Sequence, residues 1–481
     1  MLQTGAVAIA EAVRAGRCRA AEVLGCCRAR HEQTHERLNA LVQPRLAEAV
    51  AEAAAIDADP AGPLAGVPVS VKECFPVRGL RTTLGIPARA ELVDPTDAVI
   101  VSRLRELGGV IVGKANVPQA MYLHETDNPV FGRTNHPHAA DRGPGGSSGG
   151  DAALVAAGVV PLAVGTDLAG SLRQPAHACG IAALMPRSET LGEAGGIDTL
   201  PHLRVVRPRA GFLARSVADL RLAFEAVCPA PAQPLQVRRV GWWDTAGPVP
   251  ASTAVRRGVA EAVARLEAAG VEMVPLDGSL AEEAAWLHLG IISADGGGDI
   301  RGLFAGSRPI PAVARLLRLA GMPRWLRPPA AAAARLLGRQ LEARGLLATG
   351  PRSVAGHAEL AAARATIESR FRAAAAGLDA IIAPVSAVPA LRHGSASRLL
   401  LAAAACLPAN LLDLAAGGVP VTTVQRGEDA GRPASRDPVL RAAAAADRGS
   451  VGLPIGVQVL APPGGSEATV LRVMELIERP G

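Results

Sequence analysis

Two glycine-rich turns carry the serines that are best placed to do chemistry in this sequence. Residues 141–158, DRGPGGSSGGDAALVAAG, hold the adjacent serines Ser147 and Ser148 just ahead of an apolar stretch. A second turn, TDLAGSLRQP, places Ser171 after the apolar segment VVPLAVG. A serine attacks carbonyl carbons when a base takes its proton and nearby N–H groups stabilise the oxyanion that forms. The sequence therefore contains candidates for a nucleophilic serine.

Lysine is almost absent from the chain, and this draws attention to the two that remain. Of the 50 basic residues, 48 are arginine, and the others are Lys72 and Lys114. Arginine keeps its proton in proteins, whereas a buried lysine can become a neutral amine and act as a base. Lys72 ends the β-branched run VPVSVK, so it is a candidate base, with a tight packing site as the alternative. For Lys114 we favour a structural or charge-balancing role.

The glycines around Ser147 allow more than one interpretation. Gly145, Ser147 and Gly149 match the G-x-S-x-G nucleophile elbow by letters. That elbow needs a strand before its serine, but the preceding FGRTNHPHAADRGP is typical of a loop, so the elbow interpretation fails. Two interpretations then remain from the residues alone: a flexible linker, or a backbone held close to a reacting group.

Short apolar strands that alternate with helices would position these residues. Strand-like runs occur at 67–71 and 159–166, and a helix followed by a strand is expected within 97–118. Ser171 would then follow a buried strand, where open α/β sheets place their active sites. The turn could offer converging amides as an oxyanion hole, from Leu168, Ala169, Gly170 and Ser171. The pattern predicts an α/β fold with a large mixed, mainly parallel central sheet and helices on both faces.

The runs GVPVSVKECF, GPGGSSGGDAALVAAG and GTDLAGSLRQPA together resemble the amidase signature family, and the likeness extends over nearly the whole chain. The resemblance implies a Ser-Ser-Lys triad with Ser171 as the nucleophile, Ser147 as the bridging serine and Lys72 as the base. The two serines have the 24-residue spacing of that family, and a cis peptide bond is expected before Ser147. The linker interpretation thereby loses its support.

The resemblance also implies a domain organisation and a set of supporting residues. One amidase signature domain would span residues 1–481, with a helical region at 1–60 and the catalytic core at 61–225. The supporting residues are Ser148, Thr166, Asp167 and Arg173. We interpret Asp167 and Arg173 as a structural ion pair that shapes the nucleophile turn. The chain departs from the family pattern in two places: Ala169 replaces a glycine, and the usual Gly-Leu-Lys-Pro reads Ala-Leu-Met-Pro at 183–186, so that Met185 stands in place of a lysine.

Within the family, the runs NVPQAMY, NPVFGRTNHP, ISADGG and SVGLPIGVQ resemble its fatty acid amide hydrolase branch. This implies a hydrolase of fatty acyl amides such as N-acylethanolamines, with Met121, Tyr122 and Ile292 lining the substrate channel. The run GSLRQPA also resembles the glutamine amidotransferases of the family, but the C-terminal half does not. Two alternatives remain open: an esterase or acyltransferase that uses the same triad, or a degenerate amidase-like binding protein.

Residues 308–341 form an arginine-rich, apolar segment with seven arginines and no acidic residue. Its apolar stripe at helical spacing, and the tryptophan that follows, comprise Val313, Leu316, Leu317, Ala320 and Trp325. One interpretation is an amphipathic helix packed on the core. The other, which the resemblance implies, is a helical cap that binds an anionic membrane surface and admits a lipid amide.

The remaining composition narrows the class of protein. The net charge is +6, and no basic-aromatic interleaving suggests nucleic acid. Seven cysteines without ligand spacing, and histidines without a helical ligand pair, predict no metal and no cofactor. The sequence shows no signal peptide and no run long enough to cross a membrane, so a cytoplasmic protein is expected, with peripheral membrane binding as the alternative. The expected partners are a small-molecule or lipid amide and a second copy in a homodimer.

Overall fold

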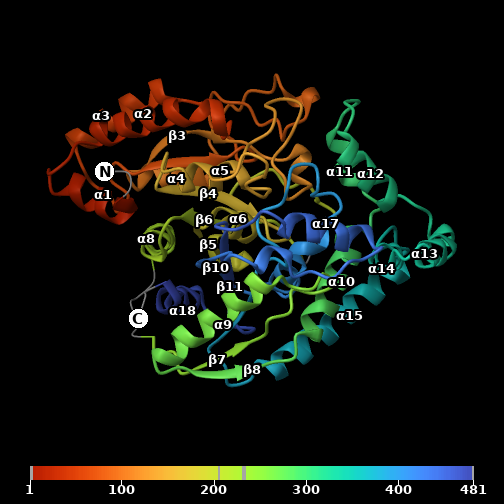
Figure 1. Ribbon diagram of the computed structural model, residues 1–481. Helices are drawn as coiled ribbons and strands as arrows, with labels where there is room; N and C mark the ends of the chain where they lie inside the picture. The colour runs from red at the N-terminus through yellow and green to blue at the C-terminus, as the bar shows by residue number, and fades with distance from the viewer. Residues whose placement is uncertain (1–3, 204–205, 230–234, 479–481) are drawn as a thin grey trace.

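The apolar, β-branched runs of the sequence form the strands of one large sheet. The computed structural model describes residues 4–203, 206–229 and 235–478. Within them, eleven strands pair in the order β1-β3-β2-β4-β6-β5-β10-β11-β9-β7-β8 (Figure 1). The strands are β1 (Leu41–Pro44), β2 (Pro68–Lys72), β3 (Val110–Ala115), β4 (Leu162–Asp167), β5 (Ala182–Met185), β6 (Arg209–Ala214), β7 (Arg239–Trp242), β8 (Glu272–Pro275), β9 (Ala380–Pro384), β10 (Ala416–Thr423) and β11 (Pro454–Leu460).

Helices connect most of these strands. The α-helices are α1 (Gly5–Arg14), α2 (Ala20–Leu38), α3 (Leu46–Ala58), α4 (Val99–Glu106), α5 (Gly149–Ala156), α6 (Arg173–Cys179), α7 (Ser188–Leu191), α8 (Val217–Val227), α9 (Thr253–Ala268), α10 (Ser279–Ile292), α11 (Gly298–Leu303), α12 (Pro311–Ala320), α13 (Arg327–Leu336), α14 (Gln340–Ala348), α15 (Val354–Ala374), α16 (Leu407–Leu411), α17 (Pro438–Asp447) and α18 (Glu467–Glu478). Short 3-10 turns are η2 (Pro87–Arg89), η3 (Gln119–Met121), η4 (Arg324–Leu326), η5 (Leu400–Cys406) and η6 (Glu428–Ala430).

The predicted mixed α/β sheet is confirmed, but the prediction that it is mainly parallel is wrong. Among the described residues, only β2/β3, β2/β4, β7/β8 and β7/β9 pair in parallel, and the other six pairings are antiparallel. The strand–helix–strand unit read from the sequence forms the parallel pair β2/β3. The centre is built from long-range pairings such as β5 with β10, which local periodicity cannot reveal.

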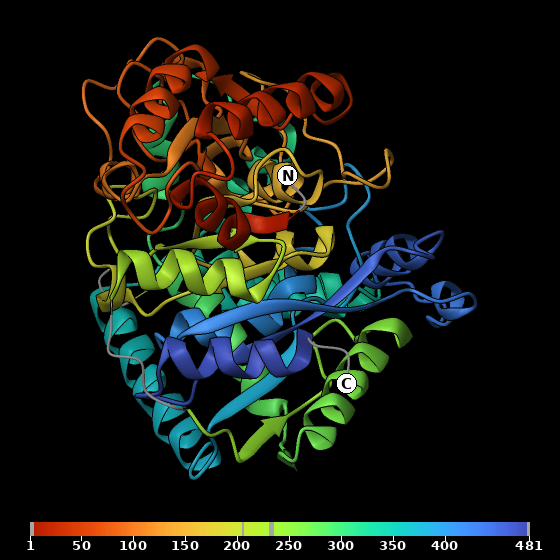
Figure 2. The same ribbon diagram turned by 90° about the vertical axis from the view of Figure 1, so that its left-hand side faces the viewer.

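Helices cover both faces of the sheet. A side chain added at Gly417 of β10 would meet Met474 of α18, whereas one at Gly418 would point toward Arg173 of α6. Successive residues of a strand face opposite sides, so α18 and α6 lie on opposite faces. Figure 2 shows α8 and α18 together on the face turned to the viewer. The two serine turns lead into α5 and α6, so the face that carries α6 is the one that matters for chemistry.

The N-terminal region expected to be helical at 1–60 also contributes a strand. Helices α1, α2 and α3 form as expected, but β1 lies between α2 and α3 and pairs antiparallel with β3 at the edge of the sheet. This strand has only four residues, LVQP, and ends in proline. A run this short gives no clear period-2 pattern, which explains why the sequence did not predict it.

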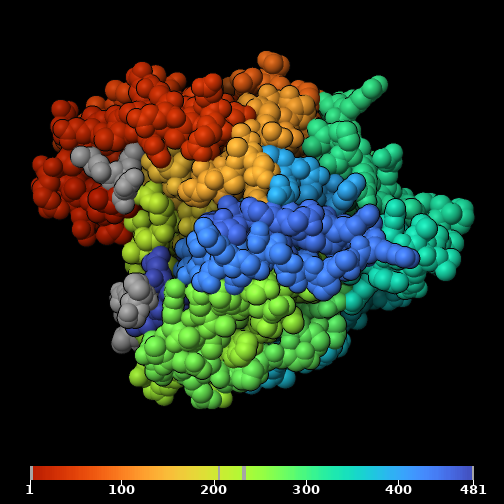
Figure 3. Space-filling view, viewed as in Figure 1, coloured from red at the N-terminus to blue at the C-terminus, as the bar shows by residue number. Residues whose placement is uncertain are grey.

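Helices α11 to α14 stand at one end of the molecule, away from α1 to α3 (Figure 1). The space-filling view shows the segment of α13 projecting from that end (Figure 3). Arg327 ties this group together from inside, because its buried guanidinium donates to carbonyls that include Leu319, Leu346 and Thr349. In the described part of the chain, no helix combines the length and apolar character needed to cross a bilayer.

Candidate active site

Three elements bring the predicted triad residues to one end of the sheet. Lys72 is the last residue of β2, Ser147 lies two residues before α5, and Ser171 lies between β4 and α6. Lys72 Nζ donates a hydrogen bond to Ser147 Oγ at 2.8 Å. The same amine donates to Thr166 Oγ1 at 2.7 Å and to the Thr166 carbonyl at 3.2 Å. The lysine is therefore aimed at the bridging serine from the end of a strand.

Lys72 lies in an environment that favours the neutral amine. Its side chain is fully buried, and no carboxylate lies within ion-pairing distance among the described residues. Burial lowers the pKa of Lys72, while Cys74, Asp151 and Asp167 act in the opposite direction. A lysine whose pKa is lowered holds more of the free base at neutral pH, which is what proton removal from Ser147 requires.

The second half of the predicted relay is open. Within the described residues, Ser171 Oγ makes no hydrogen bond, although the residue is only 8% exposed. The two serine turns are instead joined by their backbones, since the Ser148 amide donates to the Ser171 carbonyl at 3.2 Å. Ser148 Oγ also donates to the Thr166 carbonyl at 3.3 Å. The Gly146–Ser147 peptide bond is cis, as the sequence resemblance implies.

A buried ion pair shapes the turn that carries Ser171. Arg173 Nε and Nη2 donate to the two carboxylate oxygens of Asp167 at 3.0 and 3.1 Å, and both side chains are fully buried. Burial raises the pKa of Asp167, but Arg173 outweighs it and holds that pKa well below its usual range. The structure thus brings together the two residues that we interpreted as a structural pair.

The same arginine connects the turn to the last third of the chain. Arg173 Nη1 donates to the Cys406 carbonyl at 3.0 Å and to Gln458 Oε1 at 2.8 Å, and Nη2 donates to Asn410 Oδ1 at 2.7 Å. Met185, which replaces the usual lysine, places its neutral sulfur 3.7 Å from Nη2. A lysine there would set a second cation beside Arg173. Support for the site therefore extends beyond residues 61–225.

The predicted oxyanion hole is only partly available. The Gly170 amide donates to Asp167 Oδ1 at 2.7 Å, so it is not free for a substrate oxygen. The amides of Leu168, Ala169 and Ser171 donate to no described group, and they remain the candidate donors. His124 Nε2 lies 3.1 Å from the Ala169 carbonyl and holds the other side of this peptide. The prediction for Gly170 is corrected because Asp167, three residues earlier, caps its amide.

Ala169 does not strain the turn. Among the described non-glycine residues, a positive φ occurs only at Asn39, Leu84, Ala120, Met121, Ala305 and Asp413. Gly170 is the residue that needs this region, with φ +93°, and a Cβ there would lie 2.9 Å from Cys406 Cβ. The methyl group of Ala169 instead packs in an apolar cluster with Ala285, Ala404, Leu407 and Leu289. The added Cβ is therefore accommodated.

The predicted channel residues lie on segments that approach the nucleophile turn, but no hydrogen bond joins them to Ser171. Met121 and Tyr122 precede His124, which contacts the Ala169 carbonyl. Ile292 ends α10, the helix whose Ala285 and Leu289 pack near Ala169. All three predicted residues are half-buried. Their role as a substrate channel stays a prediction.

Lys114 has a different environment from Lys72. Its amine donates to the Arg81 carbonyl and to Thr82 Oγ1, both at 2.7 Å, and lies 3.5 Å from Asp94. Burial lowers the pKa of Lys114, and Glu73 and Asp94 oppose that effect. A cation held between a carbonyl, a hydroxyl and carboxylates ties loop 81–94 to β3. This contact set agrees with the structural role expected from the sequence.

Two further features lie near the site. A cavity of about 590 Å³ is bounded by Phe75, Thr166 and the segment 187–198, but none of the three triad residues lines it. In the described part of the chain, one group could suit a metal ion: His202, Asp295 and Asp299. His202 Nδ1 lies 2.6 Å from Asp299 Oδ2, and Asp295 accepts from the amides of Gly297 and Asp299. These internal contacts account for the group, and we assign no metal to it.

Sequence reasoning missed several residues that complete the site. Asn410 and Gln458 lie far along the chain from Ser171, and nothing in a single sequence indicates that they meet Arg173. His124 contacts the Ala169 carbonyl, but it lies outside the sequence motifs, which give no signal for that contact. Asp151 stands inside the quoted serine motif, so its acidic character next to a predicted buried helix was an available signal.

Comparisons with known proteins agree with this geometry. The amidase family model matches residues 22–471. Fatty-acid amide hydrolase 1 of Sus scrofa is 33% identical over 450 residues, covering 87% of this chain and 76% of that protein. Fatty acid amide hydrolase 1 of Caenorhabditis elegans is 30% identical over 477 residues, covering 92% and 82%. A solved fatty acid amide hydrolase superposes with a TM-score of 0.85 at 21% identity, over 99% of this chain and 85% of that one, which supports the shared fold.

Proposed function

The chain belongs to the amidase family and is an amide hydrolase, and on this premise we propose that it cleaves fatty acyl amides through a triad of Ser171, Ser147 and Lys72. The observation that carries the triad is the 2.8 Å hydrogen bond from a fully buried Lys72 to Ser147 Oγ, beside a nucleophile turn fixed by Asp167. A buried amine, a bridging hydroxyl and a shielded second serine are the parts needed for acyl transfer.

The proposed reaction has two stages. Neutral Lys72 takes the proton of Ser147, which takes that of Ser171 as its oxygen attacks the amide carbonyl. The oxyanion is stabilised by amides of the turn, and the proton returns through Ser147 to the leaving amine. Water then cleaves the acyl-enzyme by the same proton path. An alcohol leaving group or an amine acceptor would use the same intermediate, so esterase and acyltransferase activities are outcomes of product analysis.

We further propose that residues 308–341 form a membrane-binding cap, with a different apolar surface from the one expected. Leu317 is buried with Val313 and Ala320, and Leu316 is half-buried, so this stripe of α12 packs on the core. The exposed apolar side chains lie on η4 and at the end of α13: Trp325, Leu326, Leu336 and Leu337. Exposed large apolar residues flanked by arginines are typical of surfaces that bind anionic lipid.

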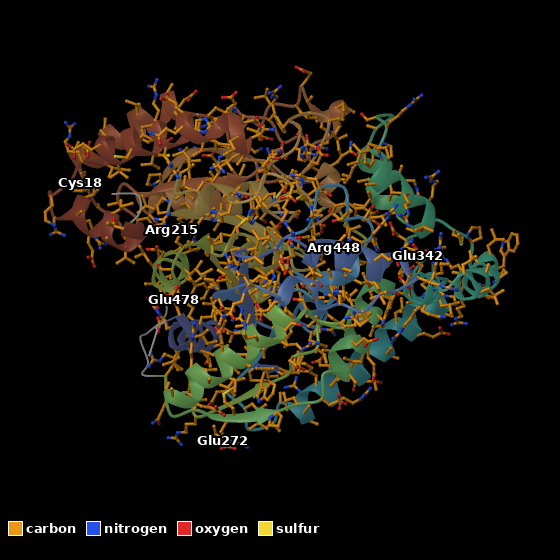
Figure 4. All side chains as sticks on the ribbon, viewed as in Figure 1. Cys18, Arg215, Glu272, Glu342, Arg448 and Glu478 are labelled. Carbon is orange, nitrogen blue, oxygen red and sulfur yellow. The ribbon has the colours of Figure 1, made fainter. Side chains whose placement is uncertain are left out.

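The charge around this cap supports the proposal. Glu342, at the start of α14, pairs with Arg315 at 3.2 Å and with Arg339 at 3.4 Å, and Figure 4 shows it at the same end of the molecule as α13. Arg327 is occupied inside the cap. Arg318, Arg324 and Arg335 are exposed and form no ion pair among the described residues, so they are available for lipid phosphates.

Labelling with a fluorophosphonate probe tests the catalytic proposal directly. We expect the parent protein to be labelled on Ser171, identified by peptide mass mapping, and to hydrolyse an N-acylethanolamine. The Ser171→Ala variant should lose both labelling and hydrolysis, because the proposed nucleophilic oxygen is removed. Ser188→Ala, on an exposed segment, is the matched control and should retain both. Labelling of another serine, or full hydrolysis by Ser171→Ala, would contradict the assignment.

A further inference from the structure

A second buried carboxyl group lies beside the proposed base, and the triad mechanism gives it no role. Asp151 is in the first turn of α5, four residues after Ser147, and its side chain is fully buried. Ser70 Oγ donates to Asp151 Oδ1 at 2.8 Å, while Oδ2 has no partner in the described structure. A buried carboxylate with one hydrogen bond is costly unless a nearby charge or a proton compensates it.

Two parallel links join β2 to the start of α5. Ser70 and Lys72 are two residues apart on β2, so their side chains lie on the same face of the strand. Ser70 bonds Asp151 at 2.8 Å, and Lys72 bonds Ser147 at 2.8 Å. Because Ser147 and Asp151 bracket the entry to α5, a shift of that helix along β2 would change both links. The first link therefore helps to set the geometry of the second.

Two carboxyl groups lie near Lys72, and they differ in whether a cation contacts them. Four titratable groups face Lys72 from its own strand end and from the neighbouring elements: Cys74, His124, Asp151 and Asp167. Asp167, at the end of β4, is already paired with Arg173, so its charge is largely balanced. Asp151, on α5, forms no ion pair among the described residues.

The other two groups are neutral near pH 7. Burial raises the pKa of the Cys74 thiol to about 11, and burial lowers the pKa of His124 to about 4. Burial also raises the pKa of Asp151 to about 7, with Ser70 and Lys72 opposing. Two groups that interact and titrate in one range exchange protons as a pair. Burial lowers the pKa of Lys72, so a change in the charge of Asp151 near pH 7 acts on a lysine whose ammonium form is already disfavoured.

We propose that Asp151 is a positioning residue for the triad: through Ser70 it holds the entry of α5 against β2, and its charge sets the pH at which Lys72 becomes a base. This rests on the proposed function, because the charge of Asp151 affects a rate only if Lys72 is the base. A carboxylate near the lysine stabilises the ammonium and so raises the pH needed for activity.

The test compares the pH dependence of fluorophosphonate labelling and of amide kcat/KM in the parent and in Asp151→Asn. Loss of the carboxylate lowers the pKa of Lys72, so the acidic limb should move to lower pH by about one unit, the scale of coupled sites. Ser70→Ala keeps the carboxyl group but removes the hydrogen bond that favours its charged form, so it should lower the plateau rate and move the limb in the same direction by less than Asp151→Asn does. Asp94→Asn, beside the other buried lysine, is the matched control and should leave the limb in place.

A second measurement starts with the parent protein alone, so its first result does not require any variant to fold. With only two lysines in the chain, 13Cε-lysine labelling gives two NMR signals, and the signal of Lys72 should titrate in two steps in the parent. Asp151→Ala, which removes the charge without adding bulk, should give one step and the same shift of the limb as Asp151→Asn. A single-step titration in the parent, or an unchanged limb in both variants, would overturn the proposal. A parent that neither labels nor hydrolyses amides would instead contradict the proposed function.

Discussion

Lys72 and Lys114 are both buried, but their side-chain amines have different contacts. Lys72 donates to two hydroxyl groups and a carbonyl, whereas Lys114 lies beside Asp94. Both are buried, but only the first has no carboxylate in contact, so its ammonium form is the less stabilised of the two. In a chain whose other basic residues are all arginines, one of the two lysines thus lies 2.8 Å from a serine hydroxyl group, where the proposed mechanism requires a base.

Replacing Lys72 should separate its basicity from its charge. We expect Lys72→Ala to lower kcat/KM at pH 7 by about 10²–10⁴-fold, the usual contribution of a general base, with partial recovery at high pH as serine ionises unaided. Lys72→Arg should be similarly impaired, because arginine keeps its proton. The measurement is kcat/KM from pH 5 to 10.

In the parent, burial lowers the pKa of Lys72, so activity should persist below the usual lysine range and fall as the pH drops through that lowered value. Thermal unfolding of each variant is the control for folding. Parent-like activity in Lys72→Arg would remove Lys72 from the mechanism.

At the scale of residues, the sequence motifs located Lys72, Ser147 and Ser171. The two serines lie in glycine-rich turns and the lysine ends an apolar, β-branched run, and both patterns can be recognised from neighbouring residues. The partners of Arg173 could not be found in this way. Asn410 and Gln458 are ordinary polar residues more than 230 positions away, and only the folded sheet brings them to the guanidinium.

At the scale of elements, the turn between β4 and α6 is held by hydrogen bonds from both sides. Asp167 accepts hydrogen bonds from the amides of Gly170 and Leu172, and His124 holds the Ala169 carbonyl. These contacts orient the peptides of the turn before any substrate arrives. Donors that are fixed in advance stabilise a developing oxyanion without reorganisation.

Substitutions at Gly170 and at Ala169, two neighbouring positions of this turn, should differ strongly in their effects on stability and on kcat. Gly170→Ala places a Cβ at φ +93° and within 2.9 Å of Cys406. It should cost more than about 1 kcal/mol of unfolding free energy and lower kcat by about 10²-fold as donors move. Ala169→Gly adds flexibility where φ is not positive, so it should cost only about 0.4–1 kcal/mol and leave kcat nearly unchanged.

Urea unfolding and steady-state kinetics on both variants provide the measurements. An active, stable Gly170→Ala protein would mean that the turn tolerates a different path. A large gain in kcat for Ala169→Gly would mean that the alanine methyl group does obstruct the oxyanion hole.

The strands that border this turn were predictable, and their arrangement was only partly so. Runs such as PVSVK and LAVGTD are apolar and β-branched, and they form β2 and β4. Their parallel pairing follows from the local strand and helix order. The antiparallel centre depends on contacts between distant segments, such as β10 with β5, and carries no local signal.

On the scale of the whole molecule, helices α11 to α14, which hold the proposed cap, stand at one end (Figure 1). The core packs around the sheet, while η4 and the end of α13 present large apolar side chains to solvent. Trp325 is 75% exposed and Leu336 is 90% exposed. The sequence predicted an amphipathic segment here, but helical spacing alone could not indicate that α12 turns its stripe inward.

Vesicle binding tests the cap. Changing Trp325, Leu336 and Leu337 together to serine should weaken binding to anionic vesicles by at least about tenfold, since each buried apolar side chain contributes about 1.5–3 kcal/mol. Turnover of a long-chain amide in vesicles should fall, while a short soluble amide is hydrolysed as before. Binding should also weaken as salt increases.

The matched control is Leu92→Ser with Val93→Ser, a pair of exposed apolar residues on another segment. It should bind vesicles like the parent. Equal loss of both substrates in the cap variant, or no vesicle binding by the parent, would return these helices to a purely structural role.

The hydrogen bonds of Arg173 to residues late in the chain have a consequence for folding during synthesis. All three triad residues are synthesised by position 171, yet the guanidinium that organises the nucleophile turn needs Cys406 and Gln458. A growing or truncated chain that stops before these positions has the serine but not its scaffold. We expect such a fragment to be unreactive toward amides, so that acyl-enzyme chemistry begins only when β11 has joined the sheet. The proposed nucleophile would then become reactive only after residues 406 and 458 have been synthesised and folded against Arg173.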